Sequence, residues 1–271
     1  KGRPLQNMIQ IEKDEKVKAV INVNDINNPD YVCNHYLIMC TEQGIIKKTT
    51  LEAYSRPRAN GINAININDG DHLLDVKLTN GSNEVVIATR SGRAIRFNEA
   101  KVRPMGRTAT GVKSVTLEDK DDYVVGMATI DDPTTQTLLV VSEKGYGKRT
   151  DIEDYRITNR GGKGVRTLNI TEKTGLLVSI LRVIDGDDLM IINKSGIIIR
   201  TPVDELRVMG RATQGVRLIK LSETDKISSI ARIEKMAGED EVKIDDPLDT
   251  DPLEPSGTPE LGTEETENEQ Q

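Results

Sequence analysis

The sequence predicts an all-β fold, a propeller-like array of four-stranded blades followed by a disordered acidic tail. Three observations predict it: an internal repeat of about fifty residues, strand-like alternation inside each repeat, and weak helical periodicity. One four-stranded sheet cannot bury its faces alone, so neighbouring copies must stack. Two glycines mark the repeat, spaced 48, 53 and 51 residues apart for the first and 50, 53 and 51 for the second. They are Gly44, Gly92, Gly145 and Gly196, then Gly61, Gly111, Gly164 and Gly215.

Each repeat reads as four strands. A short apolar run meets a turn at the first glycine (EQG, RSG, EKG or KSG) and returns as a second strand, which is a hairpin signal. A loop leads to the second glycine, and alternation follows it, as in VKSVTLED and VRLIKLSE. A fourth apolar strand, such as VVGMATI, ends the repeat. The predicted units are a half blade at 1–35 and repeats at 36–84, 85–137, 138–188 and 189–235.

The net charge of −7 combines two regions of opposite sign. Residues 236–271 hold thirteen Asp and Glu against one Lys, whereas residues 1–235 hold 36 Lys and Arg against 31 Asp and Glu. The tail is rich in Pro, Glu, Thr and Gly and poor in large apolar residues, so burial cannot offset the entropy of ordering it. We expect a disordered tail behind a mildly basic body.

Basic residues recur at equivalent positions of the repeats. Lys or Arg stands four residues after every first glycine, another basic slot precedes the second glycine, and a third follows it by two residues. Any one of these would ordinarily be a solvated surface charge, but recurrence weakens that interpretation. Stacked blades would align them into a basic edge, which suits a bent duplex because DNA carries one charge per roughly 1.7 Å of helix axis. The predicted DNA-contacting cations are Lys48, Arg58, Arg96, Arg107, Lys113, Arg149, Arg160, Arg166, Arg200, Arg211 and Arg217, with Arg103, Arg156 and Arg207 as a further set.

The stretch ITNRGGKGVRT, residues 157–167, is the segment whose composition best suits phosphate binding. Gly161, Gly162 and Gly164 can adopt backbone conformations closed to other residues, and Lys163 lies among them. Bare amides could contact a phosphate while the flanking cations neutralise it, and such contacts carry no base information. Any sequence preference would then come from the ease of bending DNA. The alternative is an ordinary glycine turn between strands, since every repeat has one.

Little in the sequence favours an enzyme acting alone. The chain has two histidines, and it lacks a paired-carboxylate motif, a P-loop string and a nucleophile elbow; GYGKRT does not have Walker-A spacing. Tyr54 and Tyr155 share a slot with Val102 and Leu206, which predicts core packing rather than a nucleophile. We therefore expect no catalytic residue in this chain.

The remaining composition predicts a reduced cytoplasmic protein. Its two cysteines are expected as buried thiols, and Cys33, His35 and Cys40 lie too close together on one strand to form a tetrahedral metal cage. No apolar run approaches the roughly 18 residues of a membrane helix, and no signal-like start is visible. We expect no metal, no membrane and no small-molecule substrate.

Several stretches resemble the C-terminal domain of the DNA gyrase A subunit. They include GIIKKTTLEAYSRPRANG, VRPMGRTATGV, KGYGKRT, SGIIIRTPVDEL and VMGRATQGVRLI, and the resemblance covers about residues 1–235. The corresponding chain of topoisomerase IV has a similar but more degenerate domain. The family's hallmark box, QRRGGKG, lies in its first blade; here Arg160 to Gly164 match the last five positions, in what chain order makes a later blade.

The resemblance implies a six-bladed β-pinwheel that wraps duplex DNA around an outer basic edge. It also implies that the domain works with the remainder of the gyrase A subunit, together with the B subunit, in an A2B2 enzyme that introduces negative supercoils in the bacterial cytoplasm. ATP and magnesium would be used elsewhere in that enzyme, so no cofactor is expected in this chain. An alternative is a protein-interaction propeller whose basic edge docks an acidic partner. The acidic tail would either compete with DNA for the basic edge or only keep the chain soluble.

Overall fold

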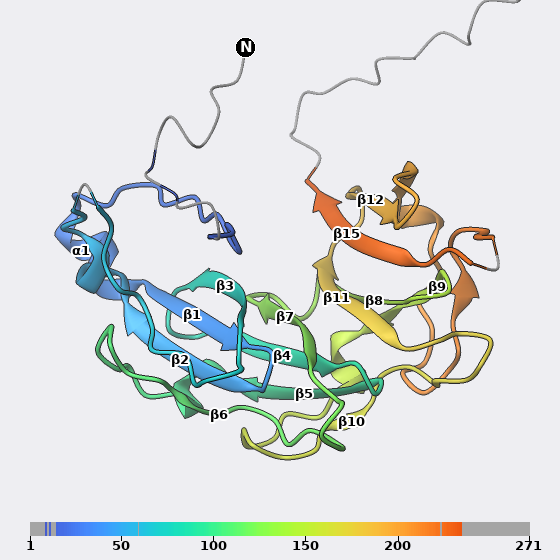
Figure 1. Ribbon diagram of the computed structural model, residues 1–271, viewed down its shortest axis with the longest axis horizontal. Coiled ribbons are helices and arrows are strands. Elements are labelled where there is room, and N and C mark those ends of the chain that lie inside the picture. The colour runs from blue at the N-terminus through green and yellow to red at the C-terminus, as the bar shows by residue number, and fades with distance from the viewer. Residues whose placement is uncertain (1–8, 10, 12–14, 59, 223, 235–271) are drawn as a thin grey trace, which may run out of the picture. The chain divides into compact units, whose positions relative to one another are not determined.

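The computed structural model describes residues 9, 11, 15–58, 60–222 and 224–234. Internal contacts divide the chain into one unit at Lys1–Lys235 and another at Met236–Gln271. The predicted disordered tail lies outside the described residues. Within the first unit the fold is all-β, apart from the short helix α1 (Pro29–Asn34) and single 3₁₀ turns after the second strands (Figure 1).

Strands of the first two repeats form two antiparallel four-stranded sheets. The first repeat supplies β1 (Tyr36–Thr41), β2 (Ile45–Thr50) and β3 (Leu73–Thr79). The second supplies β4 (Glu84–Thr89), β5 (Arg93–Asn98), β6 (Val112–Lys113) and β7 (Val124–Ile130). The first sheet has the order β3-β1-β2-β6, and the second has the order β10-β5-β4-β7, in which β10 (Val165–Arg166) comes from the third repeat.

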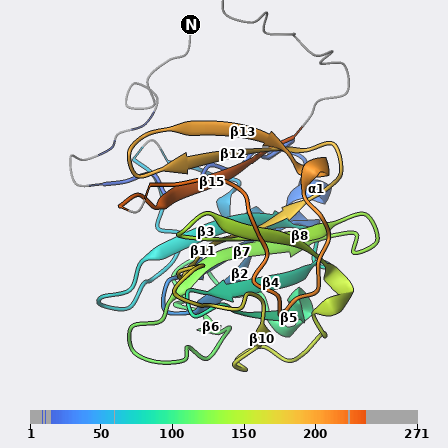
Figure 2. The same ribbon diagram turned by 90° about the vertical axis from the view of Figure 1, so that its right-hand side faces the viewer.

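The last two repeats form one complete sheet and one of three strands. The third repeat supplies β8 (Thr137–Ser142), β9 (Tyr146–Asp151), β10 (Val165–Arg166) and β11 (Leu177–Val183). The fourth supplies β12 (Asp188–Asn193), β13 (Ile198–Pro202), β14 (Val216–Arg217) and β15 (Ile227–Ile233). Their orders are β11-β8-β9-β14 and β13-β12-β15, and the sheets are stacked in Figure 2.

In the described residues, each of the first three blades takes one strand from the next repeat. The two-residue strand that follows a second glycine does not join its own repeat. Instead β6 pairs with β2, β10 with β5 and β14 with β9. One blade therefore contains three strands of its own repeat and one from the following repeat, which ties successive units together covalently as well as by packing.

The second glycine is required by this exchange. Gly164 has φ +71°, and a Cβ there would lie 2.4 Å from the Ala94 carbonyl oxygen of the preceding blade. Gly215 repeats the arrangement against the Gly147 carbonyl oxygen, also at 2.4 Å. The chain must pass this close to the neighbouring strand in order to pair with it, so only a residue without a side chain fits.

We predict that Gly164→Ala lowers the free energy of unfolding by about 3 kcal/mol, because a left-handed conformation costs roughly 1–2 kcal/mol and overpacking costs a similar amount. Gly61→Ala is the matched control, since Gly61 has φ +77° but nothing within 4 Å of its Cβ position. It should cost only about 1 kcal/mol. Urea denaturation followed by circular dichroism measures both, and equal losses would show that the close approach is unimportant.

The hydrophobic core lies between successive sheets. One cluster contains Ile38 and Ile46 of the first blade with Val85 and Phe97 of the second. Similar clusters join the second sheet to the third and the third to the fourth. Neighbouring strands β3 and β7, β7 and β11, and β11 and β15 also contact each other along one side of the array. Every blade is thus stabilised by burying a face against its neighbour.

The tyrosine slot serves packing at Tyr155, as predicted. Tyr155 is fully buried, and its hydroxyl lies 2.5 Å from Thr167 Oγ1. Val102 and Leu206 occupy the same slot and are buried as well. Tyr54 is half-buried, and its hydroxyl donates to the Ala64 carbonyl at 3.2 Å.

Two local predictions were incorrect. Helix α1 was not expected; Asn28 caps it by accepting from the amides of Asp30 and Tyr31, and Pro29 begins it. Cys33 lies on this helix and is exposed, whereas Cys40 is buried on β1. Burial raises the pKa of the Cys40 thiol to about 12. In the described ranges, no group of metal-ligating side chains comes together and no helix is long and apolar enough to cross a membrane.

Candidate nucleic-acid interface

The basic slot four residues after the first glycine is buried in three of the four blades. Arg96 is 3 % exposed. Its guanidinium donates to Glu84 Oε2 at 2.6 Å and to Glu153 Oε1 at 3.2 Å. It also donates to the carbonyls of Ile152 and Tyr155, at 2.8 and 2.9 Å, which begin and follow the 3₁₀ turn Ile152–Asp154 of the next repeat. Arg96 therefore links two blades.

Lys48 and Arg149 make the equivalent connection. Lys48 Nζ lies 3.3 Å from the Glu99 carbonyl and 3.2 Å from Glu99 Oε2, and Arg149 donates to the Val203 carbonyl at 3.3 Å and to Asp185 Oδ1 at 2.6 Å. Glu99 and Val203 begin the 3₁₀ turns of their repeats, as Ile152 does. The prediction that these cations line a solvated edge is wrong for Lys48, Arg96 and Arg149. They recur because the interface between blades recurs.

Arg200 occupies the same slot in the fourth blade, which is the last blade of the described residues. It is exposed, and its guanidinium contacts Asp188 at 2.5 Å. Asp188 stands twelve residues before Arg200, as Glu84 stands twelve before Arg96. The within-blade contact is kept, and the contact to a following 3₁₀ turn is absent from the described part of the chain.

Two lysines that the sequence did not single out fasten loops where successive repeats meet. Lys148 on β9 is fully buried, and its Nζ donates to the carbonyls of Gly210, Arg211 and Thr213. Lys47 on β2 is also fully buried and donates to the carbonyls of Ala64 and Arg107. Burial lowers the pKa of both ammonium groups to about 8, and the neighbouring arginines contribute further.

We predict that Lys148 makes the folded chain more stable at alkaline pH. Its pKa is about 8 when folded, against an ordinary value of 10.5, so between these values the unfolded chain binds more protons. The free energy of unfolding must then rise with pH across that window. Urea denaturation at pH 7.5 and pH 10 tests this: the wild type should gain stability relative to Lys148→Met. Parallel behaviour of the two chains would contradict the prediction.

The basic slot before the second glycine lies at the surface and bridges loops. Arg160 is half-buried; it donates to the carbonyls of Lys101 and Lys113, both at 3.0 Å. Arg211 makes the same bridge one repeat later, to the carbonyls of Asp154 and Arg166. Arg107 donates to the Asn63 carbonyl at 3.1 Å, and Arg58 is exposed.

These bridges gather cations from adjacent repeats. Arg160 contacts the backbone of Lys101 and Lys113, and Arg211 contacts the backbone of Asp154 and Arg166, so loops that carry exposed cations are brought together across successive repeats. We name the exposed Lys and Arg residues of these loops the basic loop set. It consists of Lys101, Arg103, Lys113, Arg156, Lys163, Arg166, Arg207 and Arg217.

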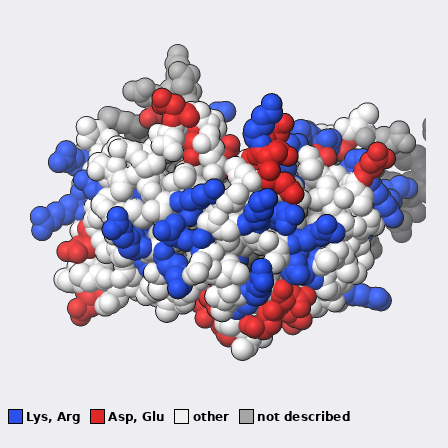
Figure 3. Space-filling view, turned by 90° about the horizontal axis from the view of Figure 1, so that it is seen from below, with Lys and Arg blue, Asp and Glu red and all other residues white. Residues whose placement is uncertain are grey.

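No member of the basic loop set forms an ion pair with a carboxylate of the described residues, which separates it from Arg96 and its equivalents. Figure 3 shows Lys and Arg side chains spread across the face that carries β6 and β10, with Asp and Glu gathered at its margins. Uncompensated charge at an open surface is the arrangement that binds a polyanion by releasing its counterions.

The glycine-rich stretch lies against this surface. The Gly161 amide donates to the Ser114 carbonyl at 2.6 Å, and Thr116 Oγ1 donates to the Gly161 carbonyl at 2.6 Å. Within the described ranges, the amides of Gly162 and Lys163 have no hydrogen-bond partner. They border a shallow hollow of about 270 Å³ that Arg156 and Gly164 also line. The loop is thus anchored through Gly161, and the hollow beside it is lined by two residues with amides unpaired among the described residues, Gly162 and Lys163, and by the cations of Arg156 and Lys163.

The fold and this surface define a class of protein: a strand-exchanged array of β-blades with an uncompensated basic face. A family model for the DNA gyrase C-terminal domain, a beta-propeller, matches residues 35–80, 83–131, 136–184 and 187–234. The chain belongs to this family.

Curated relatives support the assignment. The chain is 42 % identical to the DNA gyrase A subunit of Staphylococcus aureus (strain NCTC 8325 / PS 47) over 246 residues, which cover 91 % of this chain and 27 % of the relative. It is 42 % identical to the same protein of Staphylococcus epidermidis over 233 residues, covering 86 % and 26 %. The chain thus spans about a quarter of the length of these relatives.

Solved structures show the same fold. The C-terminal domain of DNA topoisomerase IV superposes with a TM-score of 0.77 at 26 % identity, covering 86 % of this chain and 71 % of that one. A DNA gyrase A C-terminal domain superposes with a TM-score of 0.74 at 23 % identity, covering 86 % and 76 %. The fold is therefore a β-pinwheel, as the sequence predicted.

Proposed function

We propose that this chain binds duplex DNA without sequence preference and bends it along the basic loop set. The observation that carries the proposal is the set of exposed cations without carboxylate partners, contributed from equivalent loops of successive repeats. Because the blades are stacked, these loops offer positive charge at several points along a bent path. Contacts of this kind position the phosphate backbone and do not read bases.

Family membership gives this binding its setting. We propose that the chain is the C-terminal part of a gyrase A subunit. It would act with the remainder of that polypeptide, and with the enzyme's B subunit, in the bacterial cytoplasm. The wrapped DNA would supply the neighbouring segment for strand passage, so that the A2B2 enzyme introduces negative supercoils with ATP. The chain itself would take no catalytic step, and bond breakage and ATP hydrolysis would belong to other parts of the enzyme.

The salt dependence of duplex binding tests the proposal. Fluorescence anisotropy of a labelled duplex, titrated with the 271-residue chain, gives the affinity at several salt concentrations. The logarithm of the affinity should fall with the logarithm of salt by about 0.9 per phosphate contacted, so six contacts lose roughly a thousandfold between 50 and 200 mM. Two duplexes of unrelated sequence and equal bendability should bind alike. Affinity that stays flat with salt would refute DNA binding by this surface.

A further inference from the structure

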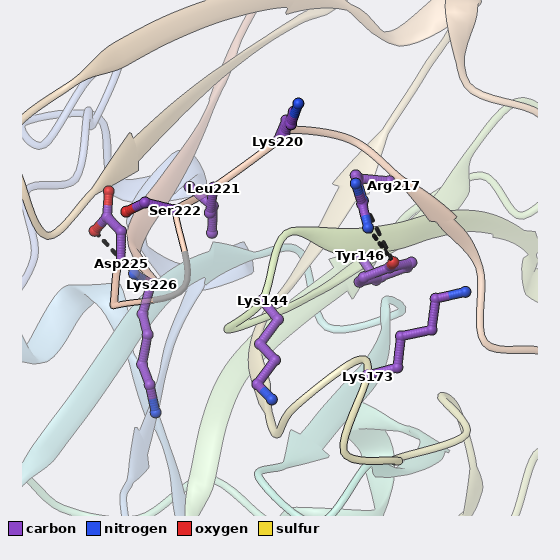
Figure 4. Close-up of a pocket in the computed structure, with 9 residues that line it drawn as sticks. All are labelled: Lys144, Tyr146, Lys173, Arg217, Lys220, Leu221, Ser222, Asp225 and Lys226. Carbon is purple, nitrogen blue, oxygen red and sulfur yellow. Dashed lines mark hydrogen bonds between the residues drawn. The ribbon is translucent and has the colours of Figure 1, made fainter.

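A second basic site lies between the third and fourth repeats, away from the glycine-rich loop. It is a pocket of about 330 Å³ around Tyr146, the residue that follows the first glycine of the third repeat. Lys144, Lys173, Arg217 and Lys220 contribute four cations to its lining (Figure 4). They come from the hairpin turn, the loop before β11 and the strand segment that crosses from the fourth repeat.

The aromatic ring is set between two of these cations. Arg217 donates to the Tyr146 hydroxyl at 2.9 and 3.3 Å through Nη2 and Nε. The Arg217 guanidinium carbon and Lys173 Nζ each lie 5.5 Å from the ring centroid. The hydrogen bond from Arg217 also lowers the pKa of the Tyr146 hydroxyl. Tyr146 therefore holds Arg217 in a fixed place beside the cavity.

Carboxylates in and around the pocket are already engaged. Asp225 accepts from Asn193 at 2.5 Å and from Ser195 at 2.9 Å, and Lys226 pairs with Glu143 at 3.0 Å. Among the described residues, none of the four cations named above forms an ion pair with a carboxylate. The pocket thus keeps an excess of positive charge that the protein does not neutralise.

The second repeat has a hollow at the equivalent position with a different set of charges. Its hollow is smaller, about 130 Å³, and is lined by Arg93 and Glu118. Arg93 replaces Tyr146, and its Nε lies 3.1 Å from Glu118 Oε2, so one of the two cations that line this hollow, Arg93 and Arg166, is paired with a carboxylate. In the third repeat the residue equivalent to Glu118 is Thr171, and Lys220 replaces Asn169. Among the four repeats only the second has an acid in the Glu118 slot, and only the fourth has a cation in the Lys220 slot.

We propose that the Tyr146 pocket binds a phosphate group carrying more than one negative charge or two adjacent phosphates. Four cations from three segments could share the phosphate oxygens, and hydrogen bonds to charged groups of this kind are among the strong ones. Two sources fit the chemistry: successive backbone phosphates of DNA, or a free diphosphate-bearing molecule. The pocket shares Arg217 with the basic loop set, whereas Lys144, Lys173 and Lys220 lie outside that set.

Inorganic pyrophosphate is the probe that tests the pocket. The full chain, labelled with ¹³C at its tyrosine rings, is titrated and the six ring signals are followed by NMR, with Tyr146→Phe identifying the relevant signal. We expect a saturable shift of the Tyr146 signal. In the Lys173→Ala/Lys220→Ala chain, Kd should rise by about a hundredfold, roughly tenfold for each lost charged contact. Lys120→Ala, at the position in the second repeat equivalent to Lys173, should leave Kd unchanged.

Adding a duplex distinguishes the two sources. If DNA displaces pyrophosphate from Tyr146, the pocket takes backbone phosphates; if DNA binds while the shift persists, the ligand is a free diphosphate. If pyrophosphate caused no shift of the Tyr146 signal, or if Kd were the same in the double variant and the wild type, the proposal that this pocket binds phosphate would be wrong. Either result is independent of the salt-dependent duplex binding that tests the proposed function.

Discussion

Arg96→Ala is expected to lower the free energy of unfolding by about 4 kcal/mol, because removing one partner of a buried pair costs roughly 3–5 kcal/mol. The substitution leaves Glu84 and the carbonyls of Ile152 and Tyr155 without their donor at the junction of two blades. A buried acceptor without a partner loses its hydration and gains nothing in return. Urea denaturation followed by circular dichroism measures the loss.

Arg200→Ala is the matched control for Arg96. It removes the same residue type from the same slot, but Arg200 is exposed and its partner Asp188 lies within the same blade. A loss of about 1–2 kcal/mol is expected, because Arg200 itself is exposed, although Asp188 is buried. If both variants lost the same small amount, Arg96 would be an ordinary surface charge, and the account of the recurring slot as a link between blades would fail.

The second large effect concerns DNA. The Lys113→Ala/Arg166→Ala/Arg217→Ala chain should bind a duplex about a thousandfold more weakly at 0.1 M salt, since three lost phosphate contacts at a slope of about 0.9 each give close to tenfold apiece. The slope of log affinity against log salt should itself fall by about 3. Fluorescence anisotropy across several salt concentrations gives both numbers.

A control triple variant changes the net charge equally. Lys77, Arg93 and Arg182 are cations that already contact carboxylates, namely Asp75, Glu118 and Asp131. Replacing all three with alanine removes the same formal charge as the first triple variant. We expect this control variant to lose much less affinity for the duplex and to keep a nearly unchanged slope of log affinity against log salt. Equal losses in the two triple variants would mean that only overall charge matters.

The hairpins and the blade count were predictable because their physical cause is local. A glycine at a tight turn, with apolar runs on both sides, specifies a hairpin within about fifteen residues, and four copies specify four hairpins. Strand exchange was not predictable in this way. The alternating segment after the second glycine has the same pattern whether it pairs with its own repeat or the preceding one, and the loop path decides between them.

Recurrence of charge was harder to interpret than recurrence of glycine. A repeated surface and a repeated interface both place like residues at equivalent positions, so the pattern of Lys48, Arg96 and Arg149 fits either. One sequence signal shows that the cation of this slot is held within its own blade: the residue twelve positions earlier is a side chain that can face a cation. These residues are Tyr36, Glu84, Thr137 and Asp188. Lys48 lies 4.5 Å from the Tyr36 ring centroid, and Arg149 donates to Thr137 Oγ1 at 3.1 Å.

The basic loop set was identified only in part from sequence. Lys113, Arg166 and Arg217 were predicted from their spacing, whereas Lys101 was not, because its slot holds Asp154 and Glu205 in the following repeats. Only the bridge that Arg160 makes to the Lys101 and Lys113 carbonyls brings these two together. Loop conformation, rather than periodicity, therefore completes the surface.

The change in plasmid linking number tests the central claim most directly. A closed circular plasmid is relaxed by an unrelated topoisomerase in the presence of the chain, the protein is removed, and the topoisomers are resolved on a gel. If exposed loop cations bend DNA along the stacked blades, the wild-type chain and the control triple variant shift the distribution of topoisomers equally. The Lys113→Ala/Arg166→Ala/Arg217→Ala chain leaves the distribution unchanged. A wild-type chain that binds the plasmid without moving the distribution, or a loop variant that moves it as far as the wild type does, would contradict the account.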